Sequence, residues 1–98
     1  MAFEIILSPD AAQSLTSLRA TDRKTVKDAM KEHLKHRPEA VSRSRIKRLH
    51  GLDSPQYRLR VRDDLRVYYD VVEDRVEVLA VLSKEQSLQW LEEQEGLK

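Results

Sequence analysis

The fold of this 98-residue chain is clearest in residues 57–72, which read YRLRVRDDLRVYYDVV. The first six residues alternate between apolar or aromatic side chains and arginines. This period of two predicts a half-buried strand with Tyr57, Leu59 and Val61 on its core face. The arginines of this strand then share the opposite face: Arg58, Arg60 and Arg62.

Two further strands follow at short intervals. Asp63 and Asp64 predict a turn, residues 65–72 predict a second strand, and a turn at residues 73–74 leads into a third strand over residues 75–82. Short connections between consecutive strands predict an antiparallel meander. The third strand is continuously apolar from residue 78 to residue 82, which is typical of a strand covered on both faces.

The N-terminal third predicts one strand and two helices. Phe3 to Leu7 is a short apolar run. Ser8 and Pro9 have the residue types of a helix cap and a first helical position, so we expect a helix over residues 9–18. Thr21 is the expected cap of a second helix, which ends before Pro38 because a residue that precedes proline avoids the helical region.

The remaining segments complete the domain. Residues 37–56 carry no sustained period and predict a long loop, with a helical turn at residues 41–46 as the alternative. Ser83 and Gln86 have the spacing of a capping box, which predicts a last helix over residues 84–94. The whole chain, residues 1–98, is therefore expected to form a single α+β domain. Its elements are an N-terminal strand, a two-helix hairpin, a three-stranded antiparallel meander and a short C-terminal helix.

Composition excludes several classes of protein. No apolar run approaches the roughly 18 to 20 residues that cross a bilayer, and no basic segment precedes the first apolar run, so we expect a cytoplasmic protein without membrane contact. The chain has no cysteine, which excludes a thiol nucleophile and a cysteine-based zinc site. His33 and His36 lie three residues apart but have no evident third ligand, and we expect no metal and no other cofactor.

The net charge of +1 conceals an uneven distribution along the chain. Residues 35–66 carry ten Lys or Arg against four Asp or Glu, a net charge of +6. Residues 67–98 carry three against eight, a net charge of −5. A concentrated basic segment is a candidate binding surface for a polyanion or an acidic partner, although a solvated surface has the same composition.

Residues 47–61, KRLHGLDSPQYRLRV, and residues 65–71, LRVYYDV, resemble the most recognisable segment of the RelE/ParE superfamily of bacterial toxins. The order of the expected elements is similar over nearly the whole chain. The resemblance implies a RelE-like fold and the toxin of a type II toxin-antitoxin system, neutralised by a cognate antitoxin.

Two activities divide that superfamily, and the fold does not choose between them. RelE-like members cleave mRNA, usually on the ribosome, whereas ParE-like members inhibit DNA gyrase and cut nothing. We expect a RelE-like endoribonuclease that acts on mRNA. A ParE-like gyrase inhibitor and a degenerate member that only binds its antitoxin are the alternatives.

The resemblance also implies the site residues. Arg58 and Arg60 match the paired basic residues of the family's second strand, and Arg66 matches the arginine that opens its third strand. A guanidinium presents a planar fork of donors to a phosphate, but its pKa above about 12 makes it a poor general base. The alternative for this face is an acidic antitoxin segment, or solvent alone.

The C-terminal segment departs from the nuclease pattern, since the family's usual general acid is missing. Lys84 is the candidate for stabilising the leaving group, and Glu85 is a candidate base, although both also suit an ordinary first helical turn. Trp90 either stacks on a base or belongs to the core. Four further residues are expected to contact RNA: Lys47, Arg48, His50 and Arg62.

The turn between the first two meander strands provides a geometric test. If Asp63 and Asp64 form a two-residue hairpin loop, Arg60 pairs with Val67, and Arg66 falls on the other face of the sheet. A single site with three arginines therefore predicts a bulge or a longer loop between residues 62 and 65.

Overall fold

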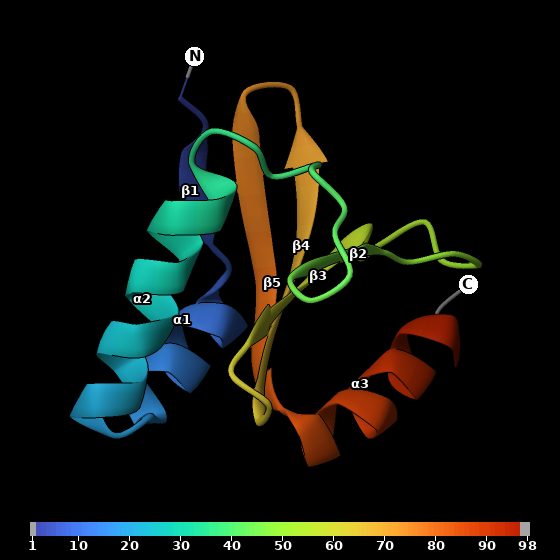
Figure 1. Cartoon of the computed structure of the whole chain (residues 1–98). Helices are drawn as coiled ribbons and strands as arrows, with labels where there is room; N and C mark the ends of the chain where they lie inside the picture. Colours follow the sequence, from blue (N-terminus) through green and yellow to red (C-terminus); the bar gives the residue numbers. More distant parts are fainter. Residues whose placement is uncertain (1, 97–98) are drawn as a thin grey trace.

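The computed structural model describes residues 2–96 and forms a five-stranded sheet with helices on both faces (Figure 1). The order across the sheet is β1-β5-β4-β3-β2. β1 pairs with β5 in parallel, and every other neighbouring pair is antiparallel. The strands are β1 (Glu4–Leu7), β2 (Ile46–Arg48), β3 (Tyr57–Val61), β4 (Leu65–Val72) and β5 (Arg75–Ser83).

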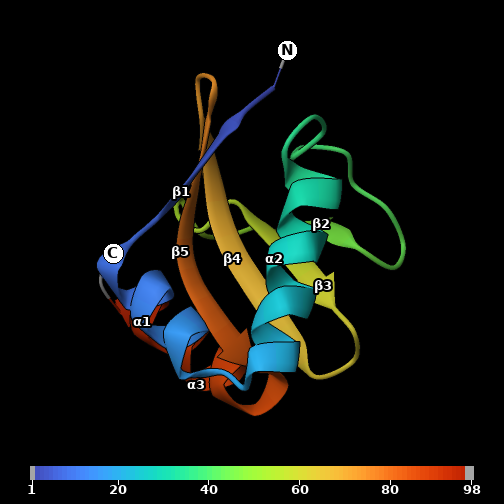
Figure 2. The ribbon, with the colours of Figure 1, turned by 90° about the vertical axis from the view of Figure 1, so that its left-hand side faces the viewer.

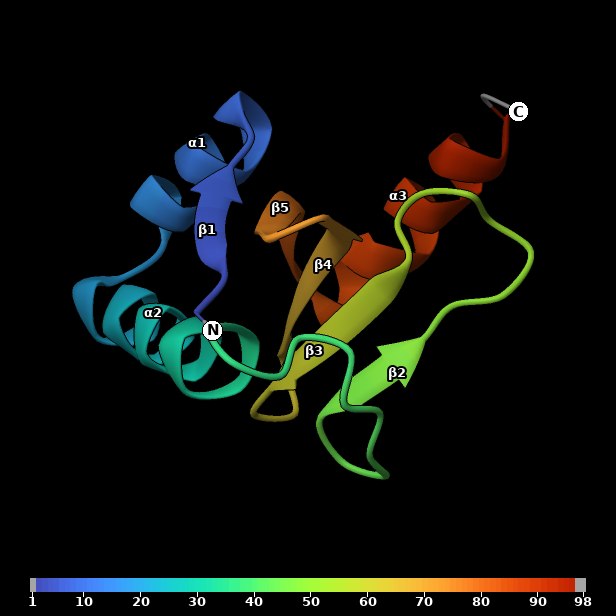
Figure 3. The same ribbon diagram turned by 90° about the horizontal axis from the view of Figure 1, so that it is seen from above.

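The α+β class and the meander of β3, β4 and β5 are confirmed. The helices are α1 (Pro9–Ser17), α2 (Ala20–Leu34) and α3 (Lys84–Gly96). α1 packs against β5 and α2 against β3, on the same side of the sheet, as Figures 1 and 2 show. α3 packs against β4 and β5 on the opposite side (Figure 3).

The hydrophobic core fills the space between the sheet and the first two helices. The strands contribute the alternate side chains that the period of two predicts, and the helices contribute residues spaced three and four apart. The main contributors are each at most 5% exposed. They are Leu15, Val26, Met30, Leu34, Leu59, Val67, Tyr69, Val76 and Val78.

Two of the three predicted helix starts are confirmed. The Ser8 Oγ accepts a hydrogen bond from the Ala11 amide at 3.0 Å and caps α1. At α3, the Gln86 amide donates to the Ser83 Oγ at 3.1 Å, and the Ser83 amide donates to the Gln86 side chain at 3.0 Å. The prediction of Thr21 as a cap is wrong, because α2 begins at Ala20 without a side-chain cap.

The N-terminus of α2 is tied to α1 by a side chain instead. The Arg23 guanidinium donates to the carbonyl oxygens of Thr16 and Leu18, at 2.9 Å each, and its Nε donates to that of Leu15 at 3.3 Å. These carbonyls belong to the last turn and the C-cap of α1, where intrahelical donors run out, although that of Leu15 also accepts from the Leu18 amide at 3.2 Å. α2 therefore begins before Thr21, which lies inside its first turn.

The expected loop over residues 37–56 contains a strand, so the sheet has one more strand than predicted. Ile46 pairs with Leu59 and Lys47 with Arg58. Three residues are too few to produce a detectable period, and the burial of Ile46, which is 3% exposed, is visible only in the folded chain. The alternative of a helical turn at residues 41–46 is also wrong, since these residues are extended or bent.

No helix among residues 2–96 combines the length and the apolar character that crossing a membrane requires.

Candidate functional site

The turn between β3 and β4 places the three predicted arginines on one face of the sheet. Val61 pairs with Leu65 and Arg60 with Arg66, so the loop contains three residues, 62–64. Its first residue, Arg62, has a φ of 56°. The predicted irregularity is confirmed, and the regular two-residue hairpin is excluded. We call the side of β2, β3 and β4 that carries Arg58, Arg60 and Arg66 the arginine face.

Arg60 and Arg66 oppose each other at short range. The Arg60 amide donates to the Arg45 carbonyl oxygen at 2.9 Å, away from β4. In an antiparallel ladder such a residue belongs to the closer kind of pair, with Cα atoms about 4.5 Å apart. Like charges directly opposite each other destabilise a sheet. Neighbouring acceptors offset this repulsion, since Arg60 is bonded to the Asp63 carboxylate and Arg66 to two backbone carbonyl oxygens.

α3 covers the arginine face unevenly, because its main contacts are with β4 and β5 (Figure 3). On β4, Arg66 is only 8% exposed. Its Nη1 donates to the carbonyl oxygens of Asp63 at 3.0 Å and Leu65 at 2.9 Å. On β3, Arg58 and Arg60 are half-buried, and Lys47 on β2 is exposed. Access to solvent thus increases from β4 towards β2.

Arg58 is the least compensated charge of the arginine face. It pairs across the ladder with Tyr68, and its Nε is buried without a hydrogen-bond partner among the described residues. Burial lowers the pKa of its guanidinium, and the charges of Arg66 and Arg60 lower this pKa further, whereas Tyr68 raises it. An anion at this position would supply the missing acceptor and restore a favourable environment for the charge.

Two further arginines of the β3–β4 hairpin, Arg60 and Arg62, have carboxylate partners. The Arg60 guanidinium is bonded to the Asp63 carboxylate and to the Arg62 carbonyl oxygen. Arg62 donates to Asp22 at 2.8 Å and to Asp64 at 3.2 Å. Because Asp22 lies in the first turn of α2, Arg62 ties the hairpin to that helix. The expectation that Arg62, a predicted RNA contact, shares the face of Arg58 and Arg60 is wrong. β3 ends at Val61, the φ of 56° at Arg62 interrupts the alternation, and its guanidinium bonds to α2, which packs on the opposite side of the sheet.

The predicted C-terminal site residues lie at the start of α3. Lys84 and Glu85 are both exposed, and the Lys84 amide donates to the Asp64 carbonyl oxygen at 2.9 Å. Lys84 therefore lies beside the β3–β4 hairpin. Trp90, further along α3, packs on Tyr68 with ring centroids 5.0 Å apart. This contact accords with the interpretation of Trp90 as a packing residue.

The remaining predicted RNA contacts separate in space. Lys47 pairs with Arg58 and shares the arginine face. Arg48 lies on the opposite face, with its guanidinium 5.0 Å from the centre of the Tyr57 ring and its Nη1 bonded to the Gln56 carbonyl oxygen at 2.9 Å. His50 is exposed in the loop that follows β2. The structure therefore brings Lys47, and not Arg48, next to the three arginines.

Sequence reasoning missed two residues of the arginine face. Arg45 continues the β2–β3 pairing opposite Arg60, and Tyr68 lies opposite Arg58. A signal for Arg45 was present, because residues 42–47 read SRSRIK and place a cation at every second position. Tyr68 belongs to an unbroken apolar and aromatic run, whose two faces only the strand register distinguishes.

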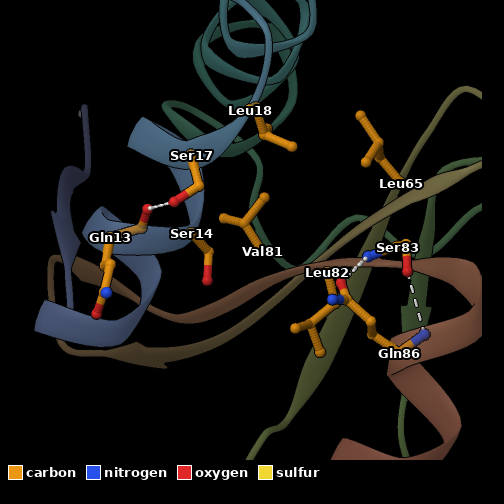
Figure 4. Close-up of a pocket in the computed structure, with 9 residues that line it drawn as sticks. All are labelled: Gln13, Ser14, Ser17, Leu18, Leu65, Val81, Leu82, Ser83 and Gln86. Atoms are coloured by element: carbon orange, nitrogen blue, oxygen red, sulfur yellow. Dashed lines mark hydrogen bonds between the residues drawn. The ribbon is translucent and has the colours of Figure 1, made fainter.

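A separate hollow lies away from the arginine face and is lined by no acidic or basic side chain. It has a volume of about 410 Å³ and opens between α1, the end of β5 and the start of α3 (Figure 4). Its polar lining consists of uncharged serine and glutamine side chains, above a floor of leucine and valine. The lining residues are Gln13, Ser14, Ser17, Leu18, Leu65, Val81, Leu82, Ser83 and Gln86.

No group of three or more His, Cys, Asp or Glu side chains within residues 2–96 is arranged to hold a metal ion. His33, half-buried on α2, lies beside Glu32 at 3.7 Å. His36 lies just beyond the end of that helix and is exposed.

Comparison with known proteins identifies the family. The family model described as "ParE toxin of type II toxin-antitoxin system, parDE" matches residues 5–88. The chain therefore belongs to this family of toxins, within the RelE/ParE superfamily that the sequence resembles. No curated protein sequence matches the chain.

Solved structures share the fold. The chain is similar to a structure of the archaeal RelE-RelB complex from Pyrococcus horikoshii, with a TM-score of 0.68, 20% identity, and coverage of 86% of this chain and 97% of that chain. It is also similar to a conserved hypothetical protein from Helicobacter pylori, with a TM-score of 0.59, 15% identity, and coverage of 85% and 96%. A copper-bound mutant toxin from Helicobacter pylori has a TM-score of 0.58, 14% identity, and coverage of 86% and 97%. These similarities confirm the RelE-like fold.

Proposed function

We propose that this toxin is a metal-independent endoribonuclease that cleaves mRNA on the ribosome, and that a cognate antitoxin neutralises it. The observation that carries the proposal is the arginine face, where Arg58, Arg60 and Arg66 share one side of the sheet and the Arg58 Nε has no hydrogen-bond partner within residues 2–96. The archaeal relative was solved as a complex of RelE with RelB, which supports a protein antitoxin for this chain.

The chemistry requires charge stabilisation more than any other contribution. The ribose 2′-oxygen attacks the adjacent phosphorus, the bond from phosphorus to the 5′-oxygen breaks, and the products are a cyclic phosphate and a 5′-hydroxyl. Cations that face the phosphate stabilise the additional negative charge of the transition state. The three guanidiniums would act in this way, and the 2′-hydroxyl proton would leave to water or to Glu85, because an arginine is a poor base.

Lys84 would assist from the start of α3. Its side chain is exposed, and its backbone amide is bonded to Asp64 in the β3–β4 loop. The expected role is stabilisation of the leaving 5′-oxygen until it receives a proton. Lys84→Gln then lowers the cleavage rate, whereas Lys84→Arg retains most of it.

Mapping new RNA 5′ ends after induction of the chain alone in a bacterial host tests the proposal. Wild type is expected to produce in-frame cuts within translated regions, and Arg58→Ala with Arg66→Ala to produce none. Because Arg66 is buried, Arg58→Ala with Arg60→Ala serves as a second variant that leaves it in place. Lys27→Ala with Lys31→Ala removes two exposed cations from α2 and is the matched control. Cutting by both arginine variants at the wild-type rate would exclude this site.

A second candidate is a toxin that inhibits DNA gyrase by binding and cuts nothing. It is favoured by the state of Arg66, whose Nη1 is engaged by two backbone carbonyl oxygens beneath α3, and by the ParE family match. Under this alternative, induction yields growth arrest without new RNA ends. Purified toxin then blocks supercoiling of relaxed plasmid DNA by gyrase, and Arg58→Ala weakens that inhibition.

A further inference from the structure

A short segment before β2 places additional cations beside the arginine face. It consists of Ser42, Arg43, Ser44 and Arg45, all of them exposed, and we call it the serine-arginine arm. No carboxylate forms an ion pair with Arg43, Arg45 or Lys47 within residues 2–96. These positive charges are therefore available to a partner.

The serine-arginine arm is held in place by its own hydrogen bonds. The Ser42 Oγ accepts from the amides of Arg45 at 3.1 Å and Ile46 at 3.4 Å, and the Ser42 amide donates to the Ile46 carbonyl oxygen at 2.9 Å. The Arg60 amide of β3 donates to the Arg45 carbonyl oxygen and fixes the end of the arm to the sheet. The arm is thus ordered before any ligand arrives, which reduces the entropy that binding must offset.

Strand register aligns the arm with the arginine face. Lys47 pairs with Arg58, so Arg45 lies opposite Arg60, and both belong to the same side of the sheet. Two rows result, each crossing from β2 to β4. Neighbouring strands lie about 4.8 Å apart, and alternate residues along a strand about 6.7 Å apart. The rows are Arg45–Arg60–Arg66 and Lys47–Arg58–Tyr68.

A hollow lies between the arm and β3. Its volume is about 70 Å³, several times the 10–15 Å³ that holds one water, so it accommodates a group of a few atoms. Five cationic side chains and two serines line it, together with Ile46, and none of its lining residues is acidic. The cationic residues are Arg43, Arg45, Lys47, Arg58 and Arg60.

The composition of this surface favours the phosphates of a nucleic acid over an acidic protein segment. The core of a protein interface is depleted of charged residues and enriched in aromatic and apolar side chains. Val41, which directly precedes the arm and is 60% exposed, is a large apolar side chain on this surface. Clustered guanidiniums with serine hydroxyls between them match the oxygens of successive phosphates.

We propose that the serine-arginine arm binds phosphates that neighbour the scissile phosphate on the same RNA strand. Arg43 and Arg45 are the contact residues. The strand would cross from the exposed arm on the β2 side to the half-buried Arg58 and Arg60. This inference rests on the proposed function. Binding by the arm is sequence-independent and depends on salt, because it consists of contacts to phosphate.

The test uses purified toxin, separated from its antitoxin, and a short fluorescent RNA with 2′-O-methyl riboses, which cannot be cleaved. Anisotropy titrations at several salt concentrations compare wild type with Arg43→Ala/Arg45→Ala, and Lys27→Ala/Lys31→Ala is the matched control. The arm variant is expected to bind about tenfold more weakly. Its slope of log affinity against log salt falls by about 1.4, or about 0.7 for each of two lost phosphate contacts. The control stays within about twofold of wild type, as expected for surface charges that touch no phosphate.

Other results would overturn the inference. These are an absence of RNA binding by wild type, or an equal loss of affinity in the arm variant and the control. If the arm variant loses affinity for its antitoxin and keeps it for RNA, the arm is a protein interface. In-cell mapping of RNA ends separates the two proposals. If wild type and the arm variant cut RNA equally, the role of the arm is contradicted and the nuclease proposal stands. If RNA binding depends on the arm but wild type cuts no RNA, the nuclease proposal is contradicted and RNA binding by the arm stands.

Discussion

The two faces of β3 and β4 differ in what they contribute to the stability of the fold. On the side covered by α1 and α2, Leu59 and Val67 are fully buried and stabilise the fold. On the other side, the alternate residues of the same strands include Arg60 opposite Arg66, and Arg58 with an unpartnered Nε. The comparison shows that packing accounts for the first face, whereas the charges of the second are best explained by a ligand.

α3 divides the arginine face into two parts that differ in exposure to solvent. It buries Arg66 and Tyr68 on β4 but leaves the cations of β2 and its preceding arm in solvent. Trp90 packs on Tyr68 and is one contact that holds the helix against the sheet. The arginine face is therefore divided into a covered part and an open part.

The largest expected effect is on the core face. Leu59→Ala removes a side chain that is 0% exposed and is expected to lower the free energy of unfolding by about 2–5 kcal/mol. Urea unfolding of the purified toxin measures it. Leu88→Ala, at a position 68% exposed, is the control and should change stability by less than about 0.5 kcal/mol. Equal losses in the two variants would contradict the assignment of the core.

The contact between α3 and the sheet is the next test. Trp90→Ala removes the ring that packs on Tyr68 and is expected to cost about 1–2 kcal/mol of unfolding free energy. Amide hydrogen exchange should accelerate in α3 and remain slow in β4 and β5. Gln89→Ala, at an exposed position of the same helix, controls for helix propensity. Unchanged protection of α3 would mean that other contacts hold it.

A smaller effect is expected at the edge of the core. The Tyr69 hydroxyl donates to the Pro38 carbonyl oxygen at 2.5 Å and fixes the segment that leads to the arm. Tyr69→Phe is expected to lower the free energy of unfolding by about 1 kcal/mol at pH 7. Urea unfolding measures the difference, and an unchanged midpoint would show that the hydrogen bond contributes nothing.

The same substitution has a distinct pH dependence. Burial raises the pKa of Tyr69 above its ordinary value, and the nearby Tyr57 and Glu39 add to the effect. The unfolded chain therefore loses this proton first, near pH 10, and the folded chain loses stability as the pH rises further. Wild type should be destabilised more steeply than Tyr69→Phe between pH 9 and about pH 11. Parallel curves would contradict the raised pKa.

The smallest effect is expected on the arginine face, and its sign is the informative feature. Arg58→Met removes a desolvated charge, so the free energy of unfolding should stay the same or rise by up to about 1 kcal/mol. Arg62→Met removes ion pairs to Asp22 and Asp64 and should lower stability instead. A clear loss of stability in Arg58→Met would show that this arginine serves the fold.

The sequence predicted the meander well because its signals are local. The alternation around Leu59 and the capping box at Ser83 depend on residues at most a few positions apart. The same locality explains the failures. β2 was missed because three residues carry no period, and the start of α2 was misplaced because Arg23 contacts the end of α1 through the folded backbone.

The candidate site was predictable only in part. Arg58 and Arg60 share a face because they are two residues apart on one strand. Whether Arg66 joined them depended on a loop of two or three residues, which the sequence left open. Arg48 was grouped with Lys47 because they are adjacent, yet adjacency in a strand places side chains on opposite faces.

The sequence by itself determined the element types, the strand faces and the family resemblance, because these follow from periodicity, capping and residue identity along short stretches. The tertiary structure decided which cations meet. Pairing of β2 with β3 brought Arg45 and Lys47 beside Arg58 and Arg60, and packing of α3 on β4 covered Arg66. These outcomes depend on contacts between residues distant in the chain, whose energies no local pattern records.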